Sequence, residues 1–222
     1  MGAQFASCWL MLWGMSAPRL HVPAVPARPG ESPDFSYVRL SPAGAVHCLP
    51  IDAPVSATVP LAEELIRVLD DAHHAVGPWN PQLDPEVLRR GMRTMLQTRV
   101  FDDRMQRAQR QGRITFYVRS LGEEAVSVAA AMALSDRDML FPSYRNQGLF
   151  LARGLTLVEL MSQLLSNTHD MCKGRQLPVM YHSVAQRLFS ISGNLATQFP
   201  QAVGWAMAAA IKGEADIAAA WI

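Results

Sequence analysis

The sequence predicts an α/β fold in which helices flank a largely parallel sheet. From residue 114 to the end, short apolar segments alternate with helical patterns in the order strand, helix, strand, helices, strand, helix, strand. Such alternation is typical of parallel sheets that are covered by helices. Apolar residues make up 50% of the 222 residues and charged residues 18%. The chain therefore has enough apolar surface for a core, and a disordered chain is not expected.

Residues 15–83 are predicted to form an extended, proline-rich arm. Most of the 15 prolines precede residue 61, and their spacing leaves no room for a helix of useful length. The apolar run from Trp9 to Trp13 lacks the preceding basic residues of a signal peptide, so residues 1–14 are interpreted as an upstream extension of the natural start. Residues 61–76 are expected to form a short amphipathic helix or a strand-like segment.

The domain predicted over residues 84–222 begins with a long helix. Its start combines a capping side chain at Asp84, a proline at the first helical position and an acid near the positive helix end. Apolar residues then recur at helical spacing until Gly112 ends the helix. The many arginines of this helix indicate either a solvated face or a contact surface for a partner subunit.

Short strands and further helices are expected after Gly112. The expected strands are residues 114–118, 139–141, 189–191 and 216–222, the last apolar enough to be buried on both faces. The expected helices are residues 125–134, 146–153, 157–165 and 197–212. Ser-x-x-Glu at Ser120 and Thr-x-x-Glu at Thr156 predict capping boxes. Residues 166–187 show no period and predict a long polar loop of the kind that often carries function.

The polar residues best placed for ligand binding follow two of the predicted strands. Ser143, Tyr144 and Arg145 come directly after residues 139–141, and residues 192–198 come directly after residues 189–191. In open α/β sheets, ligands bind beyond the carboxyl ends of the strands. An arginine fork fits phosphate oxygens, and a helix N-terminus attracts anions. The structural alternatives are a bridge for the Tyr-Arg pair and an ordinary turn and cap for the Ser-Gly-Asn segment.

Several classes of function are not expected. A formal net charge of +1 argues against a nucleic-acid-binding domain, and no apolar run approaches the roughly 20 residues of a membrane-spanning helix. The glycine-rich nucleotide motifs, Gly-x-Ser-x-Gly and His-Glu-x-x-His do not occur. Three scattered cysteines (Cys8, Cys48 and Cys172) indicate neither a zinc ribbon nor a disulfide framework, which favours a cytoplasmic location. Cys172 is not expected to be a nucleophile.

Five separated segments resemble the alpha subunits of the branched-chain 2-oxo acid dehydrogenases, also called 2-oxoisovalerate dehydrogenases. The resemblance is to the bacterial type and extends from about residue 17 to the end, including the arm up to Tyr37. The longest match reads Ile-Ser-Gly-Asn-Leu-Ala-Thr-Gln. The matching segments run from Gln109 to Tyr117, Gly122 to Ala125, Phe141 to Arg145, Lys173 to Pro178 and Ile191 to Ala206.

The resemblance implies a fold, a cofactor and partners. Members of this family are the decarboxylating component of a multienzyme complex and depend on thiamine diphosphate with Mg²⁺. The resemblance therefore implies that residues 84–222 form the N-terminal part of a thiamine-diphosphate-binding fold. It also implies an alpha2-beta2 heterotetramer, with a beta subunit, a lipoyl acyltransferase component and a small 2-oxo acid as partners, and with no role for nucleic acid or membrane.

The resemblance assigns roles to residues in the two turns. Tyr144 and Arg145 would contact thiamine diphosphate, with Arg145 on the diphosphate, and Gly193 and Leu195 would approach its aminopyrimidine and central bend. Leu195 would be the apolar wedge that holds the cofactor bent. The loop that binds a monovalent cation, potassium in animal members, would use four further residues. These are Ser192, Asn194, Thr197 and Gln198. Gly193 and Asn194 depart from the animal pattern, which has serine and proline there.

The family's remaining motifs are not matched in this sequence. A Gly-Asp-Gly motif that holds Mg²⁺ and the diphosphate is expected directly after Ile222, and the family's catalytic histidine lies further on. The ligands for Mg²⁺ are therefore absent from this chain, and the resemblance assigns it no catalytic residue. By itself, the chain is expected to be an inactive fragment.

Two alternative functions are consistent with the same residues. The first is the alpha subunit of a pyruvate or acetoin dehydrogenase, because those enzymes share the cofactor fingerprint. The long N-terminal arm and the Ser192-Gly193-Asn194-Leu195 segment favour the branched-chain form. The second alternative is a non-catalytic module whose arginine-rich helix and small-residue helices bind a beta-type partner.

Overall fold

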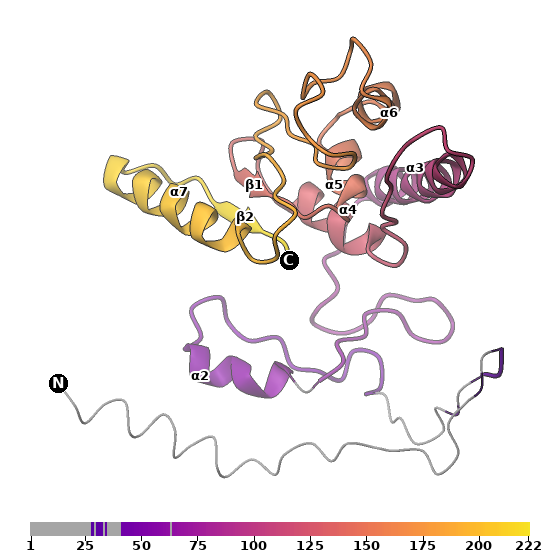
Figure 1. Ribbon diagram of the computed structural model, residues 1–222. Helices are drawn as coiled ribbons and strands as arrows, with labels where there is room; N and C mark the ends of the chain where they lie inside the picture. Colours follow the sequence, from indigo (N-terminus) through magenta and orange to yellow (C-terminus); the bar gives the residue numbers. More distant parts are fainter. Residues whose placement is uncertain (1–27, 29, 33, 35–40, 63) are drawn as a thin grey trace. The chain divides into compact units, whose positions relative to one another are not determined.

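The computed structural model describes residues 28, 30–32, 34, 41–62 and 64–222 (Figure 1). The chain divides into two compact units, Met1–Pro81 and Gln82–Ile222. Residues 1–14, interpreted above as an upstream extension, lie outside the described residues, as do residues 35–40 of the arm.

The first unit contains only short elements in its described part. A single helical turn, α2 (Val55–Thr58), leads directly into the 3-10 turn η1 (Val59–Ala62). Residues 69–75 then form a small antiparallel turn, in which Leu69 and Ala75 form a bridge. Residues 61–76 therefore end in a strand-like segment, and no helix continues beyond Ala62 in the part of this stretch that is described.

Gly77 follows this turn at a position that has no room for a side chain. It adopts a φ of +79°, and a Cβ built on it would lie 2.2 Å from the Cα of Gly44. Two backbone segments thus approach each other more closely than any side chain would permit.

The second unit begins with the long helix α3 (Pro85–Arg110), as predicted. The Asp84 carboxylate accepts a hydrogen bond of 2.7 Å from the backbone N–H of Glu86, and Pro85 occupies the first helical position. Gly112 follows the helix with a φ of +71°. The local start and stop signals are therefore confirmed at both ends of the helix.

The strand predicted at residues 114–118 and the capping box predicted at Ser120 are both wrong. The buried carboxylate of Asp102 accepts hydrogen bonds from the Tyr117 hydroxyl (2.8 Å) and from the Ser120 backbone N–H (3.0 Å). These polar groups are thus satisfied by α3 and not by a neighbouring strand. Helix α4 (Glu124–Ala133) begins at Glu124, with Glu123 at its N-cap position and no side-chain cap.

The sheet of the second unit is parallel but small. Strand β1 (Met139–Phe141) pairs in parallel with β2 (Ala218–Ala220), so that Leu140 lies opposite Ala219. The strand predicted at residues 189–191 is reduced to one parallel bridge between Leu140 and Leu188. An α/β architecture with a parallel sheet is confirmed, whereas the predicted extent of the sheet is not found among the described residues.

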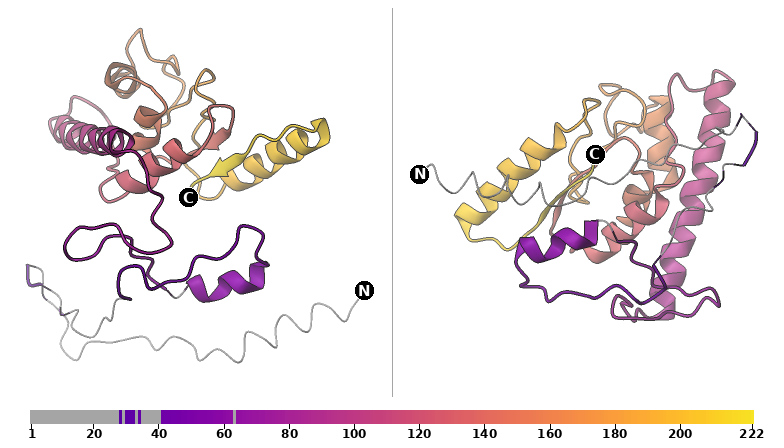
Figure 2. Two further views of the ribbon diagram at one scale, coloured as in Figure 1. Left: turned by 180° about the vertical axis from the view of Figure 1, so that it is seen from behind. Right: turned by 90° about the horizontal axis from the view of Figure 1, so that it is seen from below.

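The prediction that residues 216–222 are buried on both faces is also wrong. All three residues of β2 are half-buried, and Ile217 and Ile222 are exposed. Helix α7 (Gln198–Lys212) runs alongside β2 in both figures (Figures 1 and 2). Among the described helices, only α7 packs closely on β2. A strand that is buried on both faces needs helices on both sides of the sheet.

The remaining helices form near the positions predicted from their capping residues and the spacing of their apolar residues. Helix α5 (Gln147–Ala152) follows the turn after β1, and α6 (Leu157–Leu165) starts with a complete capping box between Thr156 and Glu159. Gly213 ends α7 in the left-handed conformation, with a φ of +73°.

The core of the second unit gathers residues from α3, α4, β1, α5, α6 and the loops between them. Fully buried members include Leu140 of β1, Leu149 and Phe150 of α5 and Leu160 of α6. The segment 166–187 has no helix or strand, as predicted, but it is not simply a polar loop. Its Tyr181 is 1% exposed and packs edge-on against Phe150, with 5.3 Å between the ring centroids.

Candidate functional site

The turn after β1 is held in place by buried hydrogen bonds. The Asn146 side-chain oxygen accepts from the backbone N–H (2.8 Å) and the hydroxyl (2.9 Å) of Ser143. The Asn146 amide group donates to the Ser127 hydroxyl of α4 at 3.0 Å. Because Ser143 and Asn146 are both buried, they fix the backbone that carries the two residues between them.

Those two residues are Tyr144 and Arg145. Tyr144 is half-buried against the core, whereas Arg145 is exposed. One guanidinium nitrogen of Arg145 donates to the Arg119 carbonyl at 2.7 Å, and the guanidinium carbon lies 5.7 Å from the centre of the Tyr144 ring. Arg145 forms no ion pair within 4.0 Å with any described residue. Its positive charge is therefore available for an anion.

The second turn precedes α7 and is closed by its own side chains. The Ser192 hydroxyl accepts from the Asn194 N–H at 3.3 Å, and the Thr197 hydroxyl donates to the Asn194 carbonyl at 2.8 Å. The backbone reverses at Ala196, which has a φ of +66°. This reversal leaves the Leu195 side chain 69% exposed, so the turn presents an apolar group to solvent at the edge of the fold.

Gln198 joins the two turns. It is the first residue of α7 and is 3% exposed. Its side-chain N–H donates to the Pro142 carbonyl, directly after β1, over 3.3 Å. The structure thus places the segment that carries Tyr144 and Arg145 beside the start of α7, although residues 189–191 before the second turn do not form the predicted strand.

Gln198 also carries a polar atom with no partner. Its side-chain oxygen is buried and accepts no hydrogen bond from the described residues. Leaving such an oxygen unsatisfied costs free energy, and an amide oxygen of this kind is able to accept a hydrogen bond or to coordinate a cation. Gly193 is close by in sequence, and a Cβ on it would come within 3.3 Å of the Met180 methyl group.

Sequence reasoning missed Glu123 and Arg119, which lie beside Arg145. Burial raises the pKa of the Glu123 carboxyl group, and the nearby Arg145 charge opposes that rise. The Arg119 carbonyl accepts the hydrogen bond from the Arg145 guanidinium. The Arg119 side chain forms ion pairs with Asp102 and Asp103 of α3. The Gly-Glu-Glu segment is part of the family resemblance, but no local pattern indicates that it approaches a residue more than twenty positions away.

The loop 166–187 contributes a separate, smaller hollow. A cavity of about 270 Å³ is lined by Lys173, Arg175, Gln176 and His182, among others. The Gln176 side-chain N–H donates to the Ser190 hydroxyl at 3.2 Å, which connects this loop to the chain just before the second turn.

The neighbouring Cys172 is not activated. Burial raises the pKa of its thiol to about 11, and Asp170 adds to that rise. The expectation that Cys172 is no nucleophile agrees with this raised pKa, because the thiolate is the reactive form.

No group of three or more His, Cys, Asp or Glu side chains could hold a metal ion anywhere in the described part of the chain. The oxygen atoms around the second turn are neutral hydroxyls, amides and carbonyls. Neutral oxygens suit a hard monovalent cation better than they suit a transition metal.

The fold and the joined turns define a class of protein. It is an α/β protein in which an exposed arginine, with no ion pair among the described residues, lies on the turn that follows a parallel strand. Comparison with known proteins narrows this class. The family model "Dehydrogenase E1 component" matches residues 92–222, and the model "2-oxoisovalerate dehydrogenase E1 alpha subunit N terminal" matches residues 16–56. The chain belongs to the family of dehydrogenase E1 components.

Individual relatives agree with this assignment. The chain is 59% identical over 204 residues to the 2-oxoisovalerate dehydrogenase subunit alpha of Pseudomonas aeruginosa, a match that covers 92% of this chain and 50% of that protein. It is 42% identical over 139 residues to the mitochondrial subunit alpha 2 of Arabidopsis thaliana, covering 62% and 29%. For the Bos taurus mitochondrial subunit alpha, the identity is 39% over 146 residues, covering 65% and 32%. The chain thus spans half or less of the length of these relatives.

Among the residues that the structure describes, no helix is both long enough and apolar enough to cross a bilayer.

Proposed function

We propose that this chain serves as the alpha subunit of a branched-chain 2-oxo acid dehydrogenase. In that role it takes part in the oxidative decarboxylation of branched 2-oxo acids, with transfer of the acyl group to a lipoyl group. The names of its relatives support this proposal. The observation that carries it is the hydrogen bond from Gln198 to the Pro142 carbonyl. This bond joins the two turns that the resemblance assigns to one cofactor.

Thiamine diphosphate is the proposed cofactor, and the residues present fit its diphosphate end. Arg145 offers an exposed guanidinium that is free of ion pairs with the described residues, on a turn made rigid by Ser143 and Asn146. A diphosphate would receive hydrogen bonds from its remaining N–H groups. When bound, thiamine diphosphate supplies the nucleophilic carbon and the electron sink for the loss of carbon dioxide.

The chain's own residues then bind and orient this cofactor. Tyr144 is half-buried beside Arg145 and offers a ring face and a hydroxyl group. On the second turn, Gly193 leaves the backbone accessible, and the exposed Leu195 would cover the bend of the cofactor and exclude water from it. These roles follow from the family resemblance, and the exposure of Leu195 is consistent with them.

A monovalent cation, potassium in the simplest case, is proposed at the second turn. The buried, unpartnered oxygen of Gln198 is the observation that supports it. Ser192, Asn194 and Thr197 would add hydroxyl, amide or carbonyl oxygens. Mg²⁺ would accompany the diphosphate, and the described residues form no acidic cluster that could hold it.

The proposed partners follow from the same assignment. They are a beta subunit in an alpha2-beta2 assembly, a lipoyl acyltransferase component and the 2-oxo acid itself. No part of the proposal involves nucleic acid or a membrane. The cytoplasm is the proposed location.

The role of Arg145 can be tested in the assembled enzyme, with the beta-type partner present and 3-methyl-2-oxobutanoate as substrate. Arg145→Ala removes a charge-assisted contact, so the thiamine diphosphate concentration for half-maximal decarboxylation should rise about 10- to 100-fold. Carbon dioxide release, measured against cofactor concentration, gives this value.

Arg110→Ala is the matched control, because Arg110 is also exposed but lies at the end of α3, away from both turns. It should leave the cofactor dependence unchanged. An unchanged value for Arg145→Ala would contradict the proposed diphosphate contact. A preference for pyruvate over 3-methyl-2-oxobutanoate in the unmodified enzyme would reassign the substrate to the pyruvate or acetoin type.

The cation site makes a separate prediction for the purified chain. Potassium chloride should raise the thermal unfolding temperature above that in tetramethylammonium chloride of equal ionic strength, because the cation binds only the folded chain. Gln198→Met keeps the size of the side chain but removes its oxygen, and should abolish the difference. An equal response of the unmodified chain and Gln198→Met would argue against this site.

A further inference from the structure

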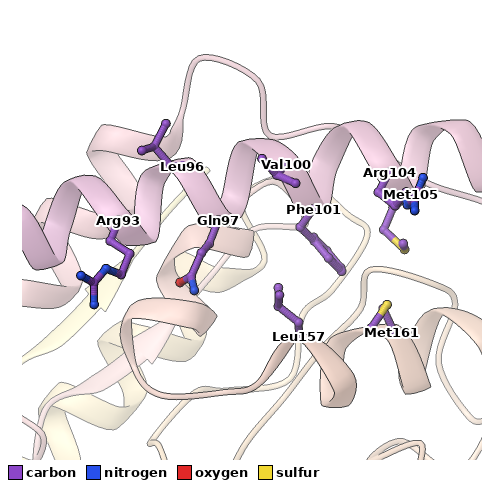
Figure 3. Close-up of a pocket in the computed structure, with 9 residues that line it drawn as sticks. All are labelled: Arg93, Leu96, Gln97, Val100, Phe101, Arg104, Met105, Leu157 and Met161. Atoms are coloured by element: carbon purple, nitrogen blue, oxygen red, sulfur yellow. The ribbon is translucent and has the colours of Figure 1, made fainter.

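Helices α3 and α6 enclose an apolar groove that lies outside the site described above. It has a volume of about 490 Å³. Phe101 and Met105 of α3 point toward Leu157 and Met161 of α6 (Figure 3). Phe101 and Met105 are 4% and 7% exposed, so they form a fixed floor that belongs to the core of the second unit.

An exposed apolar ridge runs along α3 toward this groove. Leu88, Met92, Leu96 and Val100 follow one another at four-residue spacing, and their exposures are 56%, 57%, 58% and 68%. Rows of side chains at this spacing are the ridges that pack into the grooves of another helix. Since none of the four side chains is buried by the described residues, the ridge has the shape of one half of a helix–helix contact.

Arginines border the groove and have no acidic partner. Arg93 and Arg104 line it, and Arg107 and Arg113 line the adjoining hollow of about 530 Å³. No Asp or Glu lines either space. Within the described part of the chain, none of these arginines belongs to an ion pair. The charge that complements this border is negative.

We propose that the α3–α6 groove binds an amphipathic helix of a partner chain, with an apolar stripe flanked by Asp or Glu side chains. The four-residue spacing of the ridge favours a helix as the partner. The apolar floor of the groove favours an apolar stripe on that helix, and the arginines at its border favour acidic side chains beside the stripe. A second copy of this chain offers no such helix in its described part. Helix α7 contains no acidic residue and α6 contains only Glu159. The acids of α3 (Glu86, Asp102 and Asp103) and Glu124 of α4 are already ion-paired within the chain.

A synthetic helical peptide of about 18 residues provides the probe, since this length gives about five helical turns. Its leucines lie on one face and are flanked by glutamates. A matched peptide carries lysine in place of every glutamate. Binding of both peptides to the whole 222-residue chain is measured by fluorescence anisotropy. The acidic peptide should bind at least about tenfold more tightly than the basic one, with a difference that shrinks at high salt.

Reversing the charge of an arginine at the groove should reverse the preference for the acidic peptide over the basic one. Arg93→Glu and Arg104→Glu should each weaken the acidic peptide and strengthen the basic one, and Val100→Asp should weaken both. Arg175→Glu is the matched control. Arg175 is exposed on the 166–187 loop and makes no ion pair with the described residues. It lies outside the groove, so its reversal should leave the preference unchanged. Thermal unfolding confirms that each variant is folded.

Three results would overturn the proposal. One is the failure of the acidic peptide to bind, or its binding with the same affinity as the basic peptide. Another is an equal effect of Arg175→Glu and Arg104→Glu on the preference. The third is a homodimer in sedimentation experiments that Arg104→Glu dissociates, because the groove would then belong to a second copy of the chain.

Discussion

Glu124 is a buried side chain whose charge we expect to make the stability of this fold depend on pH. It is 4% exposed at the start of α4 and accepts hydrogen bonds from the Arg99 guanidinium and from the Gly122 N–H. The Arg99 hydrogen bond is the main cause that lowers the pKa of this carboxyl group below its ordinary value of 4.5, against the effect of burial. The carboxylate therefore stabilises the folded chain above that ordinary value. This contribution is lost as the pH falls through the lowered pKa of the folded state.

The variant Glu124→Gln should make the unfolding temperature less dependent on pH. It lacks the carboxylate at every pH, so its unfolding temperature should be lower than that of the unmodified chain near pH 6. It should also fall less between about pH 6 and pH 3.5. Scanning calorimetry across this range measures both effects. Glu86→Gln alters an exposed pair with Arg89 and should keep the original pH dependence. Parallel pH curves for Glu124→Gln and the unmodified chain would refute this account.

At the residue scale, local patterns fail where a distant partner is stronger. Ser120 has the sequence of a cap residue, yet its backbone N–H and hydroxyl both donate to Asp102, eighteen positions earlier. Asp102 is fully buried, and a buried carboxylate needs several donors. No spacing within residues 114–124 indicates this competition, so the capping box was predicted where none forms.

At the scale of elements, α6 depends on a cap that the sequence does predict. The Thr156 hydroxyl accepts from the Glu159 N–H at 3.2 Å, and the Glu159 carboxylate accepts from the Thr156 N–H at 2.7 Å. The Thr156 N–H and hydroxyl lower the pKa of Glu159. α6 supplies Leu160 and Leu164 to the core, so its first turn matters for the unit as a whole.

Thr156→Ala should therefore lower the free energy of unfolding by about 1 kcal/mol, since one backbone N–H loses its acceptor. Urea unfolding measures the change. Thr156→Ser keeps the hydroxyl group and should retain most of the stability. Equal stabilities for the alanine and serine variants would show that the cap contributes nothing.

Helices and strands differ in how well local sequence predicts them. Asp84, Thr156 and Gly213 mark helix ends through bonds or backbone angles that lie within a few residues of each other. A strand exists only when a second segment supplies its hydrogen bonds. Leu188 forms a parallel bridge with Leu140. In residues 114–118, the Tyr117 hydroxyl donates to Asp102 of α3, and no strand forms. The short strands were therefore predicted less accurately than the helices.

At the scale of the whole molecule, the apolar core lies within one unit. Every member of the main buried cluster falls between Phe101 and Ile191, and both ends of this range belong to the unit Gln82–Ile222. Hydrophobic burial dominates the stability of a domain. The second unit thus contains the main source of its own stability.

A chain of residues 82–222 should consequently unfold in a single cooperative transition. Near-ultraviolet circular dichroism should show fixed aromatic packing, because Phe150 and Tyr181 lie in the core. Thermal unfolding followed by this signal and by far-ultraviolet circular dichroism should give the same midpoint. A gradual loss of helix without a near-ultraviolet signal would show that these residues do not fold alone.

The sequence by itself determined the ends of most helices, the α/β class, the turn after β1 and the family to which the chain belongs. These properties depend on neighbouring residues or on matching segments in order, and both are visible along the chain. Only the tertiary structure decided that Gln198 joins the turns at Pro142, that Asp102 replaces a strand partner and that β2 remains half-exposed. Each of these depends on contacts between residues that are distant in the chain, and the free energy of such contacts is set by packing in three dimensions.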